Sequence, residues 1–431
     1  MIDWDGIPDA RAAGVEIHAV MRELWPLPRS LTGDGLRQSL ALVSELVPLE
    51  LVETPSGTRV FDWALPREWN VREAWIAGPD GERVVDFRDS TLHLLHYSVP
   101  LRTRLPLAEL KAHLFTDDRG RERIPYRTSY YNEAWGFCLP QEQLEGLPEG
   151  EYEVCIDATL ADGHVTYGEA LLQGETEDEV LLSTYACHPS LANDNLSGVA
   201  LVAVLGKYLA NMSLRHSFRL LLGPGTIGPL TWLWRNEQRL HRVKHGLVAS
   251  CVGDSGPPTY KRSRRGDADV DRAVASALRD SGRPHRLLDW FPWGGDERQF
   301  CSPGFDLPVG ALSRTPADQF PEYHSSADDL ELVTPEMLGD SFRLYLEVFD
   351  RLERNDRFLN LNPKGEPQLG KRGLYRAVGG GSSRETALLW VLSLSDGEHD
   401  LLDISERSGV GFDALRHAAD ELLAVDLLAR A

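Results

Sequence analysis

Between residues 150 and 354, short apolar runs alternate with segments of helical periodicity. The apolar runs are EVLLSTYA, FRLLLG, GLVASCVG and LPVGALS, and the helical segments are SGVALVAVLGKYLA, PLTWLWRNEQRL, DRAVASALRDSG and PEMLGDSFRLYLEVFDRLER. Alternation of this kind is typical of a mixed or parallel sheet covered by helices. We therefore predict an α/β core, in which the carboxyl ends of the strands form the edge where ligand sites usually lie.

The segments around this core have different residue patterns. The first fifty residues predict two helices, AGVEIHAVMRELW and LTGDGLRQSLALVSELV, with Thr32 placed to cap the second. Further on, aromatic residues and turns in short runs predict a small inserted antiparallel β domain, and a Pro- and Gly-rich stretch ending in four small residues at 379–382 predicts a flexible linker. The predicted domains are the core at 1–57 and 148–360, the inserted domain at 58–147, the linker at 361–383 and a C-terminal domain at 384–431.

The C-terminal domain is predicted to form three helices with a turn at 408–411, the pattern of a winged helix-turn-helix module. Residues 384–431 nevertheless carry four arginines and ten acidic residues, a net charge of −6. The third helix has three acidic residues against Arg416 alone, whereas a helix that faces DNA phosphates needs the opposite sign. We expect this module to pack or to contact protein rather than DNA.

The composition limits the partners and the location. A formal charge of −21 disfavours nucleic acid and anionic membranes as partners, because both would be repelled. No stretch approaches 18 uncharged apolar residues, and the N-terminus lacks the features of a signal peptide. The five cysteines are scattered and have no CxxC spacing, which favours reduced thiols and argues against a cysteine zinc site. These features predict a cytoplasmic protein.

Polar residues flank the turn that follows the apolar run EVLLSTYA. His188 comes just after this run and Asp194 precedes the next helix. Taken singly, Asp194 suits a helix N-cap and His188 a hydrogen-bonded loop residue. Later predicted strands also end in polar residues, namely Asp254, Asp296, Glu297 and His324. Two histidines and several carboxylates at one edge of a sheet form a ligand set that suits a catalytic zinc ion with an open position.

Long stretches of the chain resemble the DUF4910/DUF2172 group of bacterial aminopeptidase-like proteins, which are relatives of the M28 zinc aminopeptidases. The matching stretches include SGTRVFDWALPREWNVREAWI, IPYRTSYYNEAWGFCL, STYACHPSLANDNLSG, SPGFDLPVGALSRTP, FPEYHSSADDLELV, PKGEPQLGKRGLY and LLDISERSGV. The resemblance implies a phosphorylase/hydrolase-like α/β core with an inserted β domain, a C-terminal winged helix and a zinc site. It implies four metal ligands, which are His188, Asp194, Asp254 and His324, with Asp194 bridging two ions or binding the only one.

The chain departs from the M28 pattern after the run FRLLLG. M28 enzymes have two adjacent glutamates there, a general base and a metal ligand, whereas this chain has the sequence LGPGTIG with Gly225 where the base belongs. We therefore expect one zinc ion rather than two. Ordinary peptide hydrolysis then needs another base, because a positioned base contributes roughly 10²–10⁴-fold. Glu297 is one candidate, and a carboxylate of the substrate is another.

Other residues have both a functional and a structural interpretation. Tyr323 is interpreted as a donor to an oxyanion or as a packed aromatic residue, and Arg298 as a ligand for a substrate carboxylate or as a partner in a surface ion pair. The aromatic stretch of the inserted domain is interpreted either as a lid over the site or as part of the core of that domain. It contains Tyr126, Arg127, Tyr130, Tyr131 and Trp135. Of these residues, Trp135 is expected in the core. The basic cluster of Lys261, Arg262, Arg264 and Arg265 is expected to be a solvated hairpin, with binding of an acidic substrate group as the alternative.

Three functions are compatible with these features. The favoured one is a zinc-dependent aminopeptidase-like hydrolase that acts on a small amino-acyl or peptide-like substrate, within a biosynthetic pathway. The alternative is an impaired or repurposed aminopeptidase-like metal-binding protein, which Gly225 supports. The least favoured is a winged-helix transcriptional regulator. The expected partner is a small molecule or short peptide, without nucleic acid or membrane, and self-association through the winged-helix or inserted domain is left open.

Overall fold

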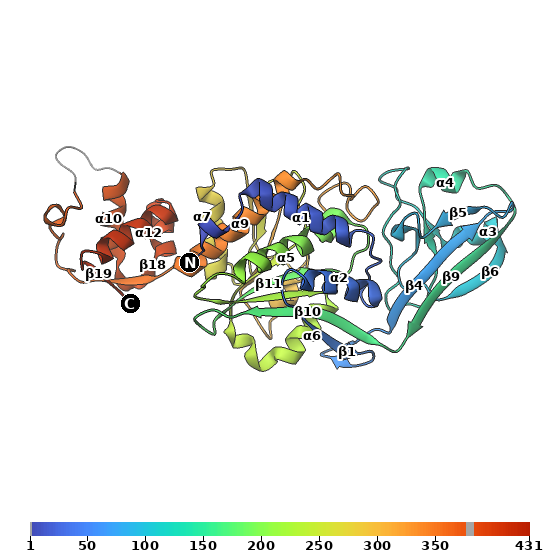
Figure 1. Cartoon of the computed structure of the whole chain (residues 1–431), viewed down its shortest axis with the longest axis horizontal. Helices are drawn as coiled ribbons and strands as arrows, with labels where there is room; N and C mark the ends of the chain where they lie inside the picture. The colour runs from blue at the N-terminus through green and yellow to red at the C-terminus, as the bar shows by residue number, and fades with distance from the viewer. Residues whose placement is uncertain (1, 376–382) are drawn as a thin grey trace. The chain divides into compact units, whose positions relative to one another are not determined.

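The computed structural model describes residues 2–375 and 383–431, which divide into two compact units. The larger unit, residues 3–266 and 286–343, holds a mixed sheet of eight strands (Figure 1). In sheet order the strands are β1 (Glu50–Pro55), β10 (His164–Leu172), β12 (Ser217–Gly223), β11 (Glu179–Tyr185), β13 (Val243–Ala249), β16 (Val309–Ser313), β14 (Thr259–Lys261) and β15 (Arg286–Leu288). The central strands β12, β11, β13 and β16 run parallel, whereas β10 and β14 are antiparallel to their inner neighbours. The predicted α/β core is therefore confirmed.

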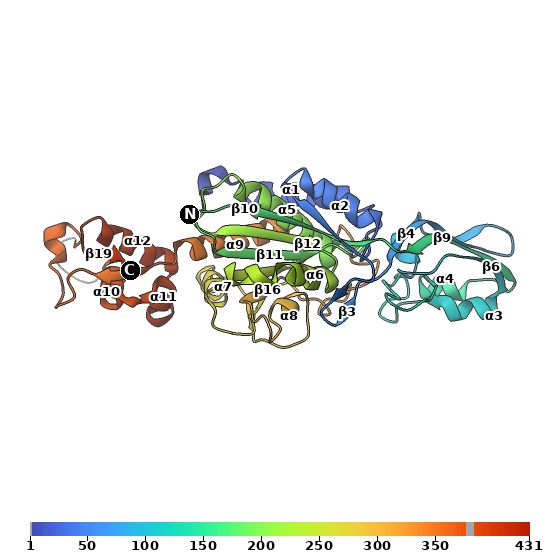
Figure 2. The same cartoon turned by 90° about the horizontal axis from the view of Figure 1, so that it is seen from below.

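Helices cover both faces of this sheet (Figure 2). On one face lie α1 (Ala10–Leu24), α2 (Asp34–Ser44) and α5 (Ser197–Leu209), and on the other lie α6 (Ile227–Asn236) and α8 (Glu297–Phe300). Every residue of β11 and β12 is buried. Their charged residues, Glu179 and Arg219, pair with each other at 2.6 Å, as burial of a charge requires. Helix α5 contacts both β11 and α1, so nearly all of it is buried, and its sequence is apolar around most of the helix.

Thr32 does not cap α2 as predicted. The helix begins at Asp34 after Gly33, and the amide of Asp34 donates to the Asn70 side chain at 2.7 Å. The Thr32 hydroxyl instead lies 2.6 Å from the Tyr97 hydroxyl and accepts a hydrogen bond from the Trp69 amide at 3.0 Å. Both partners belong to the inserted domain, so this hydroxyl satisfies buried polar groups of a distant segment, which a prediction from neighbouring residues could not include.

The inserted domain contains a four-stranded sheet in the order β5-β4-β9-β6. Its strands are β4 (Glu68–Ala77), β5 (Arg83–Asp86), β6 (Leu101–Pro106) and β9 (Glu151–Ala161), and smaller elements are β2 (Arg59–Val60), β3 (Trp63–Ala64), β7 (Leu114–Phe115), β8 (Phe137–Cys138), α3 (Leu107–Leu110) and α4 (Gln141–Glu145). The sheet includes β9, although the sequence assigned residues from 148 onward to the core. Long antiparallel pairings with β4 and β6 hold β9 in the inserted sheet.

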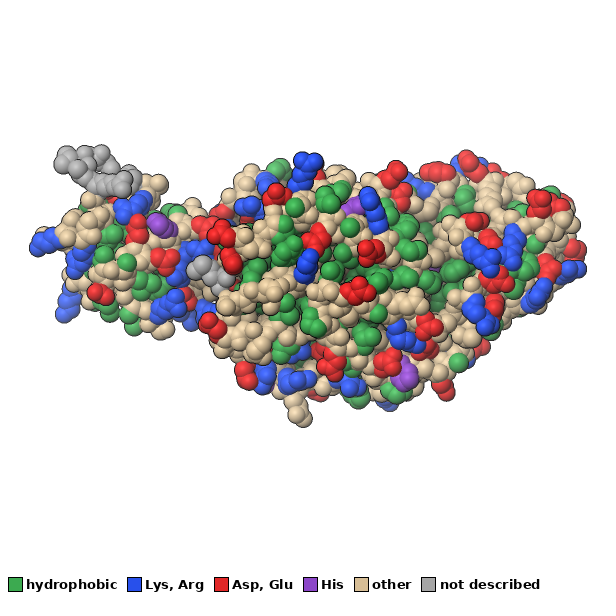
Figure 3. All heavy atoms as spheres, in the orientation of Figure 1, with side chains coloured by type: hydrophobic (Ala, Val, Ile, Leu, Met, Phe, Trp, Pro, Cys, Tyr) green, Lys and Arg blue, Asp and Glu red, His purple; other side chains and the backbone are tan. Residues whose placement is uncertain are grey.

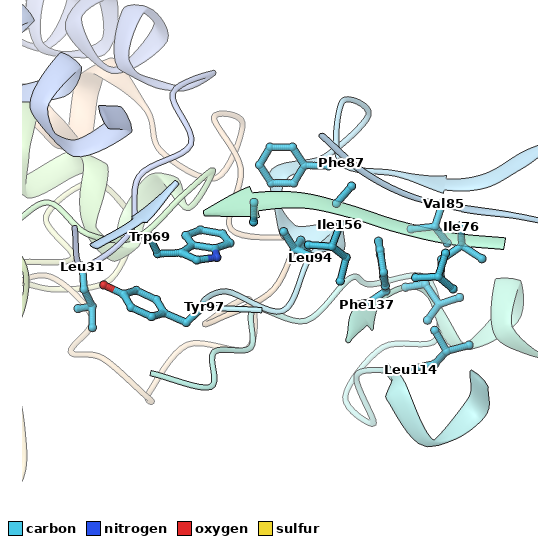
Figure 4. Packing of buried hydrophobic residues seen from close by; sticks show 14 of the residues in the cluster. Leu31, Trp69, Ile76, Val85, Phe87, Leu94, Tyr97, Leu114, Phe137 and Ile156 are labelled. Carbon is cyan, nitrogen blue, oxygen red and sulfur yellow. The ribbon is translucent and has the colours of Figure 1, made fainter. Parts of the chain in front are cut away.

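One apolar cluster joins the inserted domain to the core. Ile76, Leu94, Phe137 and Ile156 gather around β9, and Trp69 and Tyr97 lie toward Leu31 (Figure 4). The same cluster contains Tyr185, Cys187 and Ile227, which follow or end core elements at the carboxyl edge of the main sheet. Packing of the insertion therefore occurs directly beside the predicted site. Trp135 packs against this cluster, as expected, with its ring stacked on His113 at 3.7 Å.

The smaller unit contains the C-terminal domain. Its elements include α7 (Asp269–Asp280), α10 (Ser383–Leu394), α11 (Leu401–Ser408), α12 (Phe412–Leu423) and a sheet of β18 (Asp396–Asp400), β17 (Arg357–Asn360) and β19 (Leu428–Arg430); α9 (Pro335–Arg354) leads into it. The three predicted helices are present, and α9 has the predicted bounds. Strand β17 lies within the stretch assigned to the core, but it pairs with β18 and β19. The small residues at 379–382 lie outside the described residues.

Acidic and basic side chains lie close together on the inserted domain (Figure 3). Arg72 pairs with Asp157 at 2.7 Å, and Arg102 and Arg104 both pair with Glu153. Many acidic side chains of this domain are therefore paired with arginines, although the net charge of the chain is negative. Within residues 2–375 and 383–431, no helix is both long enough and apolar enough to span a bilayer.

Candidate metal centre and active-site cavity

The turn after β11 has an irregular backbone that hydrogen bonds hold in place. Asp194 lies in this turn with φ −112° and ψ 82°, which is not a helical conformation, and its side chain caps no helix. The Asp328 carboxylate accepts hydrogen bonds from the amides of Asn193 (2.6 Å) and Asp194 (2.9 Å). The Asn195 side chain donates to Thr184 Oγ1 at 2.9 Å and accepts from the Cys251 amide at 3.1 Å. The turn is thus tied to β11 and to the residues that follow β13.

His188, Asp194 and His324 lie together at the carboxyl edge of the sheet, where one ligand atom from each lies within 4.8 Å of the others. Asp194 Oδ2 is 3.3 Å from His188 Nδ1 and 3.0 Å from His324 Nε2. Atoms bound tetrahedrally at about 2.0–2.1 Å from zinc lie about 3.3 Å apart, so the three side chains fit one such ion. Asp194 Oδ2 and His324 Nε2 approach each other without hydrogen-bond geometry, and neither atom has another partner in the described part of the chain, as expected for two acceptors that face a cation.

The charges in this cluster also favour a cation. Burial by itself lowers the pKa of His188, but the charge of Asp194 and its hydrogen bonds outweigh burial, so this pKa is raised. Burial by itself raises the pKa of Asp194, but the two imidazoles outweigh it and hold this pKa well below the usual range. The buried Asp194 carboxylate is therefore stable only next to positive charge, which two protonated imidazoles or a metal ion can supply.

Asp194 offers only one oxygen to a metal. Its Oδ1 accepts a hydrogen bond from the Tyr185 hydroxyl at 2.5 Å, and Cys251 Sγ lies 4.0 Å from the same oxygen. Burial raises the pKa of Cys251 well above its usual value, which keeps the thiol protonated. A carboxylate with one oxygen occupied in this way fits a single ion better than a bridge between two.

Asp254, which the resemblance implies as a ligand, is not brought into the cluster. Its Oδ1 accepts hydrogen bonds from the Gly256 amide (2.6 Å) and the Thr315 hydroxyl (2.7 Å). Its Oδ2 accepts from the Asn193 side chain (2.8 Å) and the Thr315 amide (3.1 Å). Four hydrogen bonds occupy this carboxylate, so Asp254 supports the turn through Asn193.

Aromatic rings hold the two imidazoles. The centroid of the buried Tyr126 ring lies 5.1 Å from the ring centroids of both His188 and His324, and its amide donates to the His324 carbonyl at 2.8 Å. Tyr323 stacks on His324 with ring centroids 3.9 Å apart. Behind the site, the buried Arg29 guanidinium donates through Nε to the His188 carbonyl at 3.0 Å. Tyr126 thus contacts both predicted histidine ligands.

The cluster opens on a cavity of about 680 Å³. Its lining includes Trp63, Tyr130, Tyr131, Lys261, Phe291, Trp293, Asp296, Glu297, Arg298 and Tyr323, beside His188 and His324. Tyr131 is half exposed and packs against Trp63 with ring centroids 6.0 Å apart. The aromatic stretch that was predicted as lid or core therefore has residues of both kinds. Tyr126 is buried beneath the histidines, whereas Tyr130 and Tyr131 line the cavity.

Two charged residues of the cavity differ in their partners. Glu297 Oε1 is paired with Lys261 Nζ at 2.7 Å, and Lys261 also donates to the Trp293 carbonyl. Lys261 is therefore a buried cavity residue, whereas Arg264 and Arg265 are partly exposed and pair with Asp306, as a solvated hairpin would. The Arg298 guanidinium lies over the Trp293 ring at 5.8 Å and makes no ion pair with any described residue.

Asp296 is a cavity residue that the sequence placed at a strand end but gave no catalytic role. It is buried, its Oδ1 accepts a hydrogen bond from the Thr226 amide at 2.7 Å, and its Oδ2 has no partner among the described residues. Burial, with a smaller contribution from the charge of Glu297, raises the pKa of Asp296 to about 7. The sequence contained a signal, since Asp296 and Glu297 are adjacent carboxylates, but only the fold distinguishes the paired one from the unpaired one.

The fold is that of the M28-type aminopeptidases. BSAP, a zinc aminopeptidase from Bacillus subtilis, aligns with 80% of this chain and 95% of its own at 14% identity and a TM-score of 0.58. The peptidase M28 precursor from Shewanella amazonensis aligns over the same shares at 14% identity and a TM-score of 0.56. The larger unit thus has an aminopeptidase-like α/β fold, as the resemblance implies.

The chain belongs to the DUF4910 family, described as a domain of unknown function, which matches residues 18–355. A winged helix-turn-helix family matches residues 356–430, which confirms the predicted C-terminal module. A Clostridium acetobutylicum protein named "Putative polysaccharide biosynthesis protein with aminopeptidase-like domain" is 49% identical over 425 residues, 98% of each chain. The crystal structure of a "putative peptidase" from the same organism aligns with 98% of this chain and 97% of its own at 47% identity and a TM-score of 0.94.

Proposed function

We propose that this chain is a zinc-dependent hydrolase of the aminopeptidase type, with one zinc ion held by His188, Asp194 and His324. The observation that carries the proposal is the convergence of two unpartnered atoms, Asp194 Oδ2 and His324 Nε2, beside His188 at the wall of a cavity. Zinc bound there would supply Lewis acidity at the scissile carbonyl. The remaining steps depend on side chains of the chain itself.

The proposed substrate is a small amino-acyl or peptide-like molecule. The cavity volume suits a molecule of that size, and its aromatic residues give an apolar wall. Arg298, which makes no ion pair within the described part of the chain, is proposed to bind a substrate carboxylate. Tyr131 is proposed to contact the substrate near the exposed side of the cavity. Tyr126, which was predicted to lie over the substrate, is buried against both imidazoles and is proposed instead to hold them in position.

Tyr323 is proposed to donate a hydrogen bond to the oxyanion that forms during hydrolysis. Burial raises the pKa of its phenol, so the hydroxyl keeps its proton at neutral pH. Glu297, the base suggested by the sequence, lines the cavity but is paired with Lys261. Proton transfer by Glu297 would leave the buried Lys261 ammonium without a neutralising charge, which is costly.

The alternative proposal is a site that binds a metal but performs a different reaction, and Gly225 is the feature that supports it. The name of the Clostridium relative supports a role in polysaccharide biosynthesis for either activity. Five free, buried cysteines are compatible with the proposed cytoplasmic location.

The winged helix is proposed to act without nucleic acid. The amide of Phe412, in the first turn of α12, donates to Asp280 of α7 at 3.1 Å, and Arg416 in the same helix is buried. The first turn of a recognition helix normally contacts base edges, so this contact occupies the part that DNA would need. Self-association through this domain or the insertion is a separate proposal.

The proposal is tested by zinc analysis of protein purified without chelator, together with amino-acid release from a panel of aminoacyl amides. We expect about one zinc per chain and hydrolysis that His188→Ala abolishes together with most of the bound zinc. His241→Ala, which removes an exposed histidine, is the matched control and should leave both unchanged. Absence of zinc from the wild type would contradict the proposal, and zinc without hydrolysis would favour the alternative.

A further inference from the structure

The turn between β12 and α6 has no carboxylate of its own. At Gly225, a Cβ atom would approach only Cys187 Sγ at 3.6 Å and Tyr185 Cβ at 3.7 Å, which are ordinary contacts. A side chain would therefore fit at this position beside the cavity. Its absence is a property of this sequence and is not imposed by crowding.

A carboxylate from a distant segment reaches the same turn. Asp296, which directly precedes α8, accepts the amide hydrogen of Thr226, the residue after Gly225, at 2.7 Å. Thr226 has φ 63° and ψ −63°, a conformation that is rare and strained for a β-branched residue. The Asp296 bond helps to hold this conformation and fixes the orientation of the Asp296 carboxylate.

The second oxygen of Asp296 is available for chemistry. Oδ2 is buried and has no partner in the described residues, and Asp296 lines the same cavity as His188 and His324. The charged groups that act on Asp296 are Glu297, Arg298 and His188, and Lys261 neutralises Glu297. Of the two adjacent carboxylates, only Asp296 is free of an ion pair among the described residues.

We propose that Asp296 is the general base of this site and does the work of the carboxylate missing at position 225; this inference rests on the proposed hydrolase function. Oδ2 takes one proton from the attacking water as the water oxygen bonds to the carbonyl carbon. When the carbon–nitrogen bond breaks, that proton passes from Oδ2 to the leaving nitrogen, and Asp296 becomes a carboxylate again. The products are a carboxylic acid and an amine, so atoms and charge balance.

The protonation range of Asp296 agrees with this role. Its pKa of about 7 lies where a base is both ionised and basic enough at neutral pH.

Gly225→Glu provides a direct comparison, because it places a carboxylate on the turn where M28 enzymes have their base.

The test compares Asp296→Asn, the double variant Asp296→Asn/Gly225→Glu, and Asp289→Asn as a control on an exposed carboxylate. Asp296→Asn keeps an oxygen that accepts from Thr226, so we expect an unchanged zinc content and a melting temperature no lower than that of the wild type. We expect its kcat to fall about 10²–10⁴-fold with little change in KM, and the double variant to recover at least tenfold. Asp289→Asn should hydrolyse the panel like the wild type.

A second readout does not need hydrolysis. In metal-free protein, the infrared carbonyl bands of buried protonated carboxyls should disappear in two parts as the pH rises, through about 7 for Asp296 and about 8 for Asp328, because burial raises the pKa of both carboxyls. Asp296→Asn should lack the part that disappears through about pH 7. Either an Asp296→Asn variant with kcat within threefold of the wild type, or a wild-type loss of carbonyl absorbance through about pH 7 that persists unchanged in that variant, overturns the assignment. Loss of zinc from the wild type would instead overturn the proposed function, while the infrared titration would still report on Asp296.

Discussion

The Tyr185 hydroxyl donates a hydrogen bond to Asp194 Oδ1 at 2.5 Å, although the two residues belong to a strand and to the turn that follows it. This bond leaves Oδ2 as the only oxygen of Asp194 that faces the two histidines. A hydrogen-bond partner of this kind orients a metal-binding carboxylate toward the ion. Loss of the partner typically weakens metal binding about 10–100-fold.

Tyr185→Phe should therefore weaken zinc binding about 10–100-fold without abolishing it, because the three proposed ligands remain while Asp194 Oδ1 loses its donor. The measurement is competition for zinc against a chromophoric chelator at pH 7.5. Tyr208→Phe removes a phenol that bonds to Glu16 and should bind zinc like the wild type. An affinity of Tyr185→Phe equal to that of the wild type would show that this bond does not orient Asp194.

The stability of the metal-free protein should depend on pH through Asp296. Its pKa is about 7 when folded and about 3.8 when unfolded, so between these values the folded state holds a proton that the unfolded state has released. Raising the pH from about 4 to 7 therefore favours unfolding, by on the order of 4 kcal/mol at most, and the effect ends above pH 7.

Urea unfolding of metal-free protein between pH 5 and 8 measures this effect. Asp296→Asn should reduce the decline in unfolding free energy, because the amide does not titrate. Asp328, whose pKa burial raises to about 8, should account for a decline that remains. Asp289→Asn, at an exposed position, should keep the wild-type slope. A decline that persists undiminished in Asp296→Asn would assign the effect to another group.

Arg298→Ala should raise KM about tenfold or more for substrates that carry a carboxylate and leave KM for matched uncharged amides unchanged. The reason is that a charge-assisted hydrogen bond contributes about 1.5–3 kcal/mol, and no carboxylate of residues 2–375 and 383–431 pairs with the Arg298 guanidinium. Steady-state kinetics on pairs of free-acid and amide substrates measure the difference. Arg22→Ala, at an exposed position on α1, is the control, and an equal effect on both substrate types would contradict a role in carboxylate binding.

Gly14→Ala should destabilise the fold, because α1 and α9 cross with their backbones in contact. A Cβ at Gly14 would lie 1.8 Å from the Pro335 carbonyl oxygen, so the helices would have to separate. Overpacking of this kind costs about 1–3 kcal/mol, which a urea unfolding curve would show as a lower midpoint. Gly304→Ala, where no atom lies within 4 Å of the added Cβ, should have a much smaller effect.

The local sequence determined most of the elements. The 20 residues of α9 have their predicted bounds, because helical periodicity and the Pro335 start are encoded in neighbouring residues. The three C-terminal helices and the four parallel strands of the core, β11, β12, β13 and β16, follow for the same reason. The turn with His188 and Asp194 was also visible, since its two polar residues are only six positions apart.

Only the tertiary structure decided what each polar group does. Asp254 was grouped with the ligands because it follows a strand, but Thr315 and Asn193, about 60 residues away on either side, occupy both of its oxygens. In the same way, Thr32 bonds to the inserted domain and does not cap its own helix.

The adjacent carboxylates Asp296 and Glu297 are the sharpest example. The sequence favoured Glu297 as the substitute base, but Lys261 from β14 pairs with it, while Asp296 reaches the Thr226 amide and keeps one buried oxygen unpartnered among the described residues. Secondary structure depends on residues a few positions apart, so the sequence by itself determines it well. Which carboxylate is free depends on partners that long-range packing alone brings within hydrogen-bond distance, and this the tertiary structure decided.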